Sequence, residues 1–288
     1  MHSIDTCRVR LQSLALALLL AACATTTAPT PTQGPVTIAL TPLRERLRTV
    51  EVGVNGATGT FLFDSAGGVT MISPDVARRA GCTPAGRGVG FRMNGERLDT
   101  PLCQGLSLDI AGQHWTPRQI GVLDLSPYLA PGQTAPDGNL ALDAFEGRVV
   151  TLDVAHNALI VETPESFAAR IVGAVEVPMR LSRESQGASL SANVGVPGPD
   201  GLVWFELDSG NGGTVLVSKH LASAFHLDPA AQGPQHLELD IAPGVHLSTD
   251  RAFTPDLILD GNLGMPFLSH YVVTLDLAHE RAWLKAAA

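Results

Sequence analysis

The chain carries the same 25-residue stretch twice, and this internal repeat constrains its fold more than any other feature. Residues 137–161 read DGNLALDAFEGRVVTLDVAHNALIV and residues 260–284 read DGNLGMPFLSHYVVTLDLAHERAWL, with 11 of 25 positions identical at a constant offset of 123. Chance does not plausibly produce such a match. Each half of the chain is therefore expected to form one copy of the same supersecondary unit.

A second pair of matching segments lies upstream of the first. Residues 61–73 read FLFDSAGGVTMIS and residues 205–218 read FELDSGNGGTVLVS. Each copy predicts an apolar strand, an acidic Gly-rich turn, a second apolar strand and a Ser that caps a short helix, over residues 74–79 and 219–225. The first copy is one residue shorter, which we assign to its loop.

The order of these features predicts two related all-β halves with a few short helices. The 29 Gly and 20 Pro residues favour short strands joined by turns. We place the halves at residues 34–163 and 170–288, with an apolar Asn-Leu turn and a Val-rich hairpin closing each. The first half has 21 additional residues in its middle, in the region of Cys82 and Cys103.

The first 33 residues predict export and a tether. Residues 1–22 have the basic start and short apolar stretch of a signal peptide. Leu20-Ala21-Ala22-Cys23 resembles the lipobox of bacterial lipoproteins, which implies an acylated Cys23, a Thr/Pro-rich tether over residues 23–33 and the periplasmic face of the outer membrane. The alternative is an ordinary signal peptide with an incidental Cys.

The cysteine count predicts one disulfide. Cys7 is removed with the signal peptide and Cys23 is acylated, so Cys82 and Cys103 remain of the four cysteines. In an oxidising compartment these two are expected to pair with each other. The alternative is two separately buried thiols.

Charge and hydropathy each exclude one class: nucleic-acid-binding proteins and proteins that span a membrane. The formal net charge is −9 and the basic residues form no cluster beyond the start of the chain, so the footprint of a nucleic-acid-binding protein is missing. No apolar run reaches the ~18 residues that span a bilayer. Contact with a membrane is therefore expected through the lipid anchor only.

An Asp-Ser turn between apolar strands, followed by an apolar turn, resembles the lobe of aspartic proteases, most closely the bacterial retropepsin-like group. The resemblance covers nearly all of the mature chain, twice. It implies a monomeric, pepsin-like pseudo-dimer of two β-barrel lobes that cleaves polypeptides without a metal or cofactor. Asp64 and Asp208 would be catalytic, with Ser65, Ser209 and Gly210 supporting the active site and residues 86–100 forming the flap.

The chemistry explains why two Asp residues are needed. Two carboxylates held about 3 Å apart cannot both ionise, so they share one proton. One then acts as general base toward a water molecule, while the other acts as general acid toward the peptide carbonyl.

The first half departs from this motif at two positions. Ala66 stands where Gly is expected, and Ala141 replaces the Gly of the second turn. A Cβ at either place, together with a shortened loop, can displace Asp64, and a misplacement of 1 Å can cost on the order of 100-fold in rate. The alternative function is therefore a noncatalytic peptide- or ligand-binding module on the same fold.

Other chemistries fit the sequence less well. Asp208-Ser209-Gly210 superficially resembles a serine protease motif, but no upstream His stands in the matching setting. The nine His residues include no pair with the spacing of a helical zinc site. Asp153 and Asp276, which recur in the repeat, are expected to make polar contacts in hairpins or between the two halves, and not to be catalytic.

Overall fold

Strands dominate the residues that the structure describes, as the repeat predicts. The structure is a computed structural model that describes residues 34–44 and 46–288. The all-β fold class is confirmed, with two large curled sheets and a few short helices. Residues 34–288 form one compact unit. The predicted signal peptide, the tether and Cys23 lie outside the described residues, so acylation and location in the cell envelope stay predictions.

Two sheets hold the described strands. The larger has 12 strands, in the order β1 (Val36–Ala39), β13 (Ala158–Val161), β12 (Val149–Asp153), β21 (Tyr271–Asp276), β22 (Arg281–Ala286), β14 (Val175–Ser182), β15 (Ser191–Gly198), β16 (Gly201–Leu207), β20 (Gly261–Leu263), β17 (Val215–Val217), β19 (Val245–Phe253) and β18 (Gln235–Ala242). The other has 10, in the order β6 (Arg87–Phe91), β7 (Arg97–Cys103), β10 (Ile120–Val122), β5 (Met71–Ile72), β11 (Gly138–Leu140), β4 (Ala57–Phe63), β3 (Leu47–Val54), β8 (Leu108–Ile110) and β9 (Gln113–Trp115), with β2 (Thr41–Leu43) beside β3.

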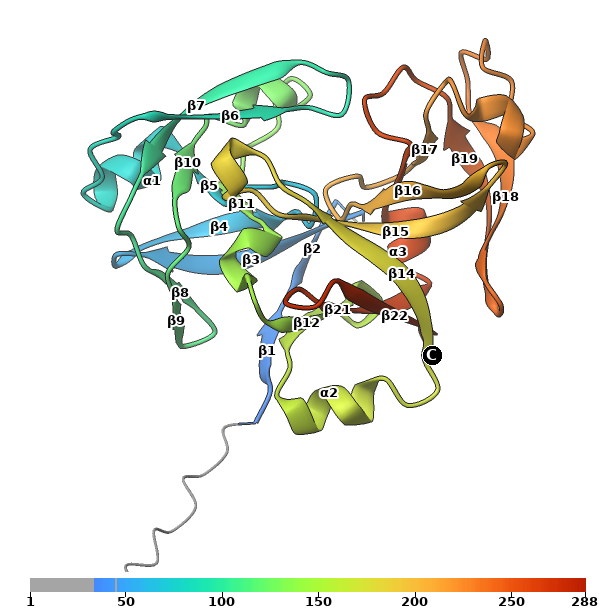
Figure 1. The fold of residues 1–288 in the computed structure, drawn as a ribbon. Helices are drawn as coiled ribbons and strands as arrows, with labels where there is room; N and C mark the ends of the chain where they lie inside the picture. The colour runs from blue at the N-terminus through green and yellow to red at the C-terminus, as the bar shows by residue number, and fades with distance from the viewer. Residues whose placement is uncertain (1–33, 45) are drawn as a thin grey trace, which may run out of the picture. The chain divides into compact units, whose positions relative to one another are not determined.

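The two halves of the chain share part of the larger sheet. There β1, β13 and β12 of the first half lie beside β21, β22 and β14 of the second, and β12 pairs with β21 in antiparallel register (Figure 1). Figure 1 shows these strands below and between the remaining strands of the two halves. Since β12 and β21 contain the repeated VVTLD run, equivalent segments meet at the centre of the molecule.

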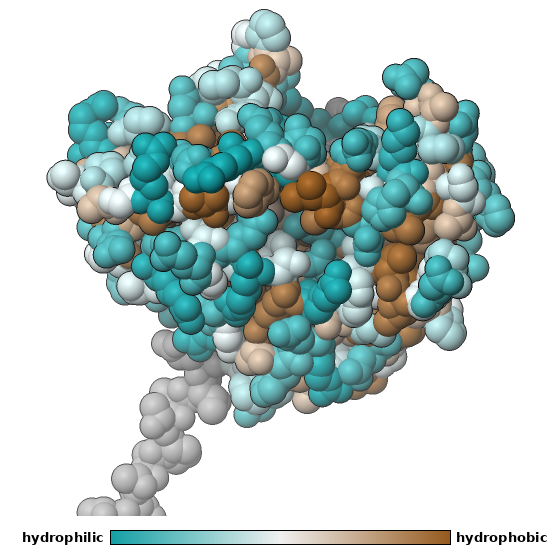
Figure 2. Space-filling view, turned by 45° about the horizontal axis from the view of Figure 1, so that its top comes forward, coloured by the Kyte–Doolittle hydropathy of each residue, from teal (hydrophilic) through white to brown (hydrophobic). Residues whose placement is uncertain are grey.

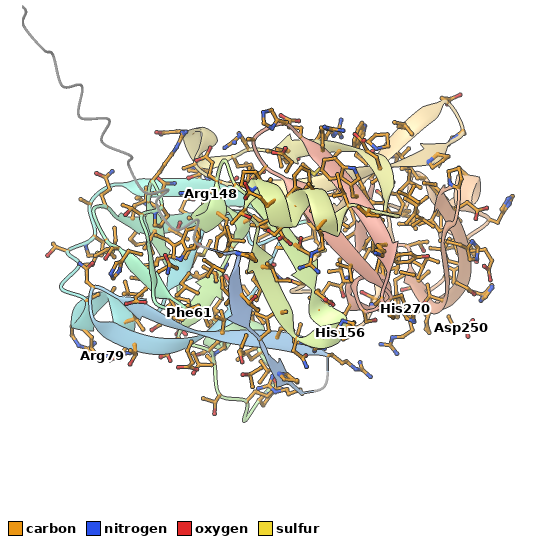
Figure 3. The ribbon with its side chains drawn as sticks, turned by 90° about the horizontal axis from the view of Figure 1, so that it is seen from below. Phe61, Arg79, Arg148, His156, Asp250 and His270 are labelled. Carbon is orange, nitrogen blue, oxygen red and sulfur yellow. A yellow bond between two sulfur atoms is a disulfide. The ribbon has the colours of Figure 1, made fainter. Side chains whose placement is uncertain are left out.

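Alternation of apolar and polar residues explains which strand faces enter the core. In β18, Leu237, Leu239 and Ile241 are buried, while the residues between them are exposed. Figure 3 shows the same division at other positions: Phe61, which is fully buried, lies among interior side chains, and Asp250 lies at the periphery. A period of two residues is the signature of a strand with one buried face.

The described helical segments are short. They are α1 (Pro74–Arg79), α2 (Pro164–Arg170) and α3 (Met265–Leu268), with 3-10 turns η1 (Ser126–Tyr128), η2 (Leu142–Phe145), η3 (Val154–His156), η4 (Ser185–Gly187) and η5 (Ala222–Phe225). None of them is long and apolar enough to span a membrane. The helix α2 occupies the segment expected to join the two halves, and the side chain of Thr163 caps its start.

The Ser that was expected to cap a helix does so only in the first half. Ser73 accepts the N–H of Val76, and α1 follows over the predicted residues. Ser218 instead contacts the His220 ring at 2.8 Å and the Leu257 carbonyl oxygen at 3.3 Å. Its hydroxyl is thereby engaged elsewhere, and the helix predicted over residues 219–225 is reduced to η5.

The repeated DGNL run forms strands and not the turns that were predicted. In the first half β11 lies parallel to β4, with Asn139 beside Leu62. In the second half β20 lies parallel to β16, with Asn262 beside Glu206. The periodicity of a three-residue strand is too short to distinguish from a turn, and the neighbouring strands on both sides determine its conformation.

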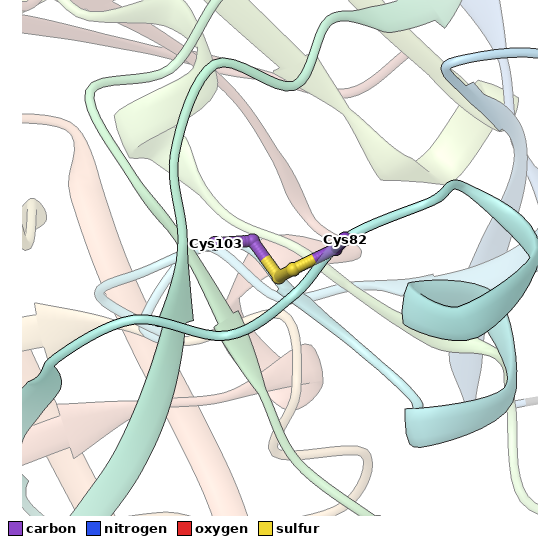
Figure 4. The surroundings of a disulfide bond; sticks show 2 residues. All are labelled: Cys82 and Cys103. Carbon is purple, nitrogen blue, oxygen red and sulfur yellow. A yellow bond between two sulfur atoms is a disulfide. The ribbon is translucent and has the colours of Figure 1, made fainter.

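A disulfide joins Cys82 and Cys103, the pair expected from the cysteine count (Figure 4). Their Cα atoms lie 6.0 Å apart. Cys82 follows α1 and Cys103 ends β7. The bond therefore ties α1 to the hairpin of β6 and β7, within the additional residues of the first half.

Candidate active site

Equivalent strands bring Asp64 and Asp208 to the site. Asp64 follows β4, and its N–H donates to the Leu140 carbonyl oxygen at 3.0 Å. Asp208 follows β16, and its N–H donates to the Leu263 carbonyl oxygen at 3.0 Å. Both Asp residues thus stand at the end of a strand that is paired in parallel with the strand of the repeated DGNL run.

Four hydrogen bonds join the two Asp turns, and each of them involves the hydroxyl of Ser65 or of Ser209. The Ser65 hydroxyl donates to the Leu207 carbonyl oxygen at 2.7 Å and accepts the Ser209 N–H at 2.9 Å. The Ser209 hydroxyl donates to the Phe63 carbonyl oxygen at 2.9 Å and accepts the Ser65 N–H at 2.9 Å. Both residues are fully buried. Neither hydroxyl is available as a nucleophile, which argues against the serine protease alternative.

The carboxyl groups of Asp64 and Asp208 meet and interact directly. Each carboxyl group lies close enough to the other to shift its pKa. Burial, and then the charge of Asp208, raise the pKa of Asp64 to about 8. Burial also raises the pKa of Asp208 above its usual value. Such a pair holds one proton between two carboxyl groups and titrates as a unit.

The hydrogen-bond donors around the pair are unequal. Asp208 accepts the N–H groups of Gly210 at 2.8 Å and Asn211 at 3.0 Å, and the Asn262 side-chain amide at 2.7 Å. Asp64 accepts the N–H of Ala66 at 3.1 Å and a backbone N–H of the same turn. Donors stabilise the ionised form of a carboxyl group. We therefore assign the negative charge to Asp208 and the shared proton to Asp64.

Gly210 is required by the close approach of Asp64. A Cβ built on Gly210 would lie 2.7 Å from Cγ and from Oδ1 of Asp64. Contacts of that length are not tolerated, so only Gly lets the second turn reach the carboxyl group of the first. Ala66 occupies the equivalent place in the first turn, and its N–H still donates to Asp64. The substitution at Ala66 thus leaves the donor in place.

The missing residue of the first half lies in a strand and not in the Asp turn, contrary to the prediction. Thr70 and Thr214 keep the offset of 144 residues that separates the two Asp residues. The strands that follow them differ, since β5 has two residues and β17 has three. The two Asp turns therefore have the same length.

Asp143 replaces in the first half an interaction that Asn211 makes in the second. Oδ1 of Asn211 accepts the N–H and hydroxyl of Thr214 at 3.2 and 2.8 Å. Oδ1 of Asp143 accepts the N–H and hydroxyl of Thr70 at 2.9 and 2.6 Å. Gly67 stands at the position equivalent to Asn211 and has no side chain to do this. Burial raises the pKa of Asp143 to about 7.

The shorter strand also explains Ala141. A Cβ on its counterpart, Gly264, would lie 2.5 Å from the carbonyl oxygen of Thr214. In the first half it is the hydroxyl of Thr70, not its carbonyl oxygen, that meets this position and accepts the Ala141 N–H at 3.1 Å. Ala141 is fully buried there. Both departures from the motif are thereby accommodated without displacing Asp64 from Asp208.

A cavity of about 560 Å³ opens over the two Asp residues. The hairpin of β6 and β7, which includes the predicted flap, lines it and contacts the second half, where the Ile258 N–H donates to the Met93 carbonyl oxygen at 3.0 Å. Three exposed large apolar side chains, Phe91, Tyr128 and Ile258, belong to its lining. Figure 2, which brings the top of Figure 1 toward the viewer, shows apolar side chains gathered in the middle of that face.

Three residues of the site were not predicted from the sequence: Glu206, Asn262 and Asp143. Glu206 stands two positions before Asp208 on a strand, and this spacing places both side chains on one face. Asn262 belongs to the repeated DGNL run, so its recurrence was a signal. Asp143 has no equivalent in the second half, where Pro266 stands, and nothing in the sequence marks it.

The remaining candidates lie away from the dyad. Asp153 and Asp276 accept N–H groups of their own hairpins and contact the rings of His156 and His279 at 2.8 Å. This agrees with the polar hairpin contacts expected for them. Across residues 34–44 and 46–288, no group of three or more His, Cys, Asp or Glu side chains is arranged to hold a metal ion.

Comparisons with solved structures show what the fold is similar to. Basic 7S globulin from soybean superposes with a TM-score of 0.56 at 12% identity, covering 88% of this chain and 95% of that one. Conglutin gamma, a basic 7S globulin from lupine seeds, superposes with a TM-score of 0.59 at 11% identity, covering 89% and 96%. The fold is similar to that of these two globulins. At these identities the likeness extends to the fold alone.

These comparisons correct the resemblance drawn from the sequence. Both similar structures are named as globulins and neither as a protease, so membership of the retropepsin-like group and of a family of bacterial lipoprotein proteases is not supported. No family model and no curated protein matches the chain. The fold is shared by proteins that are not named as proteases.

Proposed function

We propose that the chain is an aspartic endopeptidase that hydrolyses peptide bonds between Asp64 and Asp208. The observation that carries this proposal is the pair of interacting Asp64 and Asp208 carboxyl groups, which line a cavity of about 560 Å³. The Ser65–Ser209 hydrogen bonds support it, because they fix both carboxyl groups before substrate binds. No nucleophilic side chain is needed.

The assigned protonation states give each Asp a role. Asp208, as carboxylate, removes a proton from a water molecule whose oxygen attacks the peptide carbonyl carbon. Asp64 donates its proton to the carbonyl oxygen, which yields a neutral tetrahedral diol. Collapse of the diol breaks the C–N bond: Asp208 returns its proton to the leaving nitrogen, and a diol hydroxyl returns a proton to Asp64. The pair ends with the single proton that it started with.

A noncatalytic binding module is the second candidate. The observation that favours it is that both similar solved structures are named as globulins. On this alternative the apolar cavity binds a peptide or another ligand, and the buried carboxyl pair serves only to orient it.

Substitution of the two Asp residues separates the candidates. Asp64→Asn and Asp208→Asn are each expected to reduce hydrolysis of a denatured protein by at least about 1,000-fold, and the double variant to lose little more, since one unit is broken twice. Circular dichroism should show that the variants remain folded. Hydrolysis that survives Asp208→Asn would refute the mechanism, and an unmodified chain that binds peptides without cleaving them between pH 3 and pH 8 would favour the binding module.

A further inference from the structure

Glu206 places a third carboxyl group in the cavity beside the dyad. It lies on β16, two residues before Asp208, and is only 8% exposed. Its Oε2 lies 3.4 Å from the Asn262 side-chain nitrogen, which also donates to Asp208 at 2.7 Å. One amide group therefore contacts both carboxyl groups. The mechanism proposed above uses Asp208 and leaves Glu206 without a role.

The equivalent position in the first half is apolar. Leu62 stands two residues before Asp64, as Glu206 does before Asp208, and each lies beside the Asn of its DGNL run. Both side chains line the cavity. Because the two halves are related by a duplication, these residues occupy matching places on opposite sides of the dyad. The cavity thus offers an apolar contact on one side and a carboxyl group on the other.

The charges that line the cavity are strongly unbalanced. Besides the dyad, Glu184, Glu206 and Asp256 contribute carboxyl groups. Among the described residues that line it, the single cationic side chain is Arg92, which contacts Glu96 at 3.1 Å and lies over the Tyr128 ring. A cationic side chain of a ligand would therefore be attracted to this cavity, and an anionic one repelled.

We propose that Glu206 determines specificity, by receiving a Lys or Arg side chain on one side of the scissile bond while Leu62 contacts an apolar side chain on the other. The term scissile rests on the proposed endopeptidase function. Recognition itself requires only that a peptide binds over the dyad, so it can be measured whether or not the peptide is cleaved.

Binding of a cation beside Glu206 is expected to depend on pH. Burial, and then the charge of Asp208, raise the pKa of Glu206 to about 8. The titratable groups that face it are Asp208 and Asp64, and the polar neighbours are Ser191 and Asn262. A ligand cation that enters must displace the proton of Glu206. Preference for the cation is therefore expected to increase as the pH rises toward 8.

The experiment compares two fluorescent peptides that differ only in Lys or norleucine beside the apolar residue. Fluorescence anisotropy measures their affinities, and kcat/KM is measured in parallel if they are cleaved. The unmodified chain is expected to prefer the Lys peptide by about 10- to 100-fold at pH 8, with a smaller ratio at pH 5. Glu206→Gln should bring the ratio to about one. The control variant Asp109→Asn, at an exposed carboxyl group outside the cavity lining, should keep it.

Each outcome decides the assignment. A ratio of one or less in the unmodified chain, or a ratio that persists in Glu206→Gln, would overturn it. If Glu206→Gln does not fold, Glu206→Leu, which copies Leu62 of the first half, takes its place: loss of the preference for Lys supports the role of Glu206, and a preference that persists overturns it. Binding preference without any cleavage would refute the endopeptidase while retaining the subsite.

Discussion

Thr151 and Thr274, which lie 123 residues apart and occupy the same position in the repeat, face each other with their hydroxyl oxygens 3.0 Å apart. They are direct partners in the pairing of β12 with β21. A residue and its own repeat equivalent can meet in this way only near a local twofold axis. The axis relates the two Asp turns as well, so a contact far from the cavity reports the symmetry that brings Asp64 to Asp208.

Substitution of these two threonines is expected to have unequal effects. Thr151→Val removes two hydrogen bonds, the one with the Thr274 hydroxyl and the one that Thr151 donates to Glu162 at 2.7 Å, although Ser166 and Arg170 still bind Glu162. Thr274→Val leaves Thr151 its bond to Glu162. The first variant should therefore lower the free energy of unfolding by about 1–3 kcal/mol and the second by less, with a double variant smaller than the sum. Urea denaturation measures all three, and equal losses would contradict the assigned contacts.

Gly210 and Ala66 occupy equivalent positions, but we expect a substitution to be tolerated only at Ala66. Gly210→Ala would push a Cβ to within 2.7 Å of the Asp64 carboxyl group, so hydrolysis is expected to fall by at least about 100-fold. Ala66→Gly keeps the N–H that donates to Asp64 and is expected to retain activity, at a cost of about 1 kcal/mol in stability. Peptide hydrolysis and thermal unfolding of both variants test this. Comparable activity in Gly210→Ala and the unmodified chain would show that Asp64 does not work in the place described.

The pH dependence of hydrolysis follows from the single proton on the pair. The active form has Asp64 protonated and Asp208 ionised. Since the pKa of Asp64 is about 8, kcat/KM should fall about tenfold per pH unit above that value. The raised pKa of Asp208 places the acid limit above the usual value of 3.8. A profile measured from pH 3 to pH 10 should therefore peak between these limits, and an alkaline limit below pH 6 would contradict the assignment of the proton.

The repeat made most of the fold predictable from the sequence. The duplicated Asp-Ser segments and the VVTLD runs predicted two similar all-β halves, and Ser73 with the Pro that follows it marked α1 correctly. The prediction of a helix after Ser218 was wrong, because the hydroxyl of Ser218 contacts His220 and Leu257. The contact with Leu257, 39 residues further along the chain, is not visible in a local motif.

Symmetry made the two Asp residues and their supporting Ser residues predictable, although Asn262, which also recurs, was missed. Asp64, Asp208 and the two Ser residues occupy equivalent positions, and the structure brings all four together. Glu206 and Asp143 were missed because they break the symmetry: their counterparts are Leu62 and Pro266. A residue that occurs in only one of the two halves is not marked by the repeat. Its role depends on packing between strands that are distant in sequence.

Asp143 makes stability depend on pH in a way that one substitution should remove. Asp143 is 6% exposed and its carboxyl group binds Thr70, as the uncharged side chain of Asn211 binds Thr214. Its pKa is raised from 3.8 to about 7, so the folded state holds this proton more tightly than the unfolded state does. The contribution of Asp143 to stability is thus fully present below pH 3.8 and is lost as the pH rises through about 7.

Asp143→Asn supplies to Thr70 the acceptor that Asn211 already supplies to Thr214. At about 1.4 kcal/mol per pH unit, the variant is expected to exceed the unmodified chain in stability by up to about 4 kcal/mol at pH 8.5, and to match it within about 1 kcal/mol at pH 4. Urea denaturation at the two pH values measures this difference, and Asp109→Asn, at an exposed carboxyl group of the same half, is the matched control. A variant that is less stable at pH 8.5 than the unmodified chain would mean that the ionised carboxylate, and not the protonated acid, holds Thr70 in place.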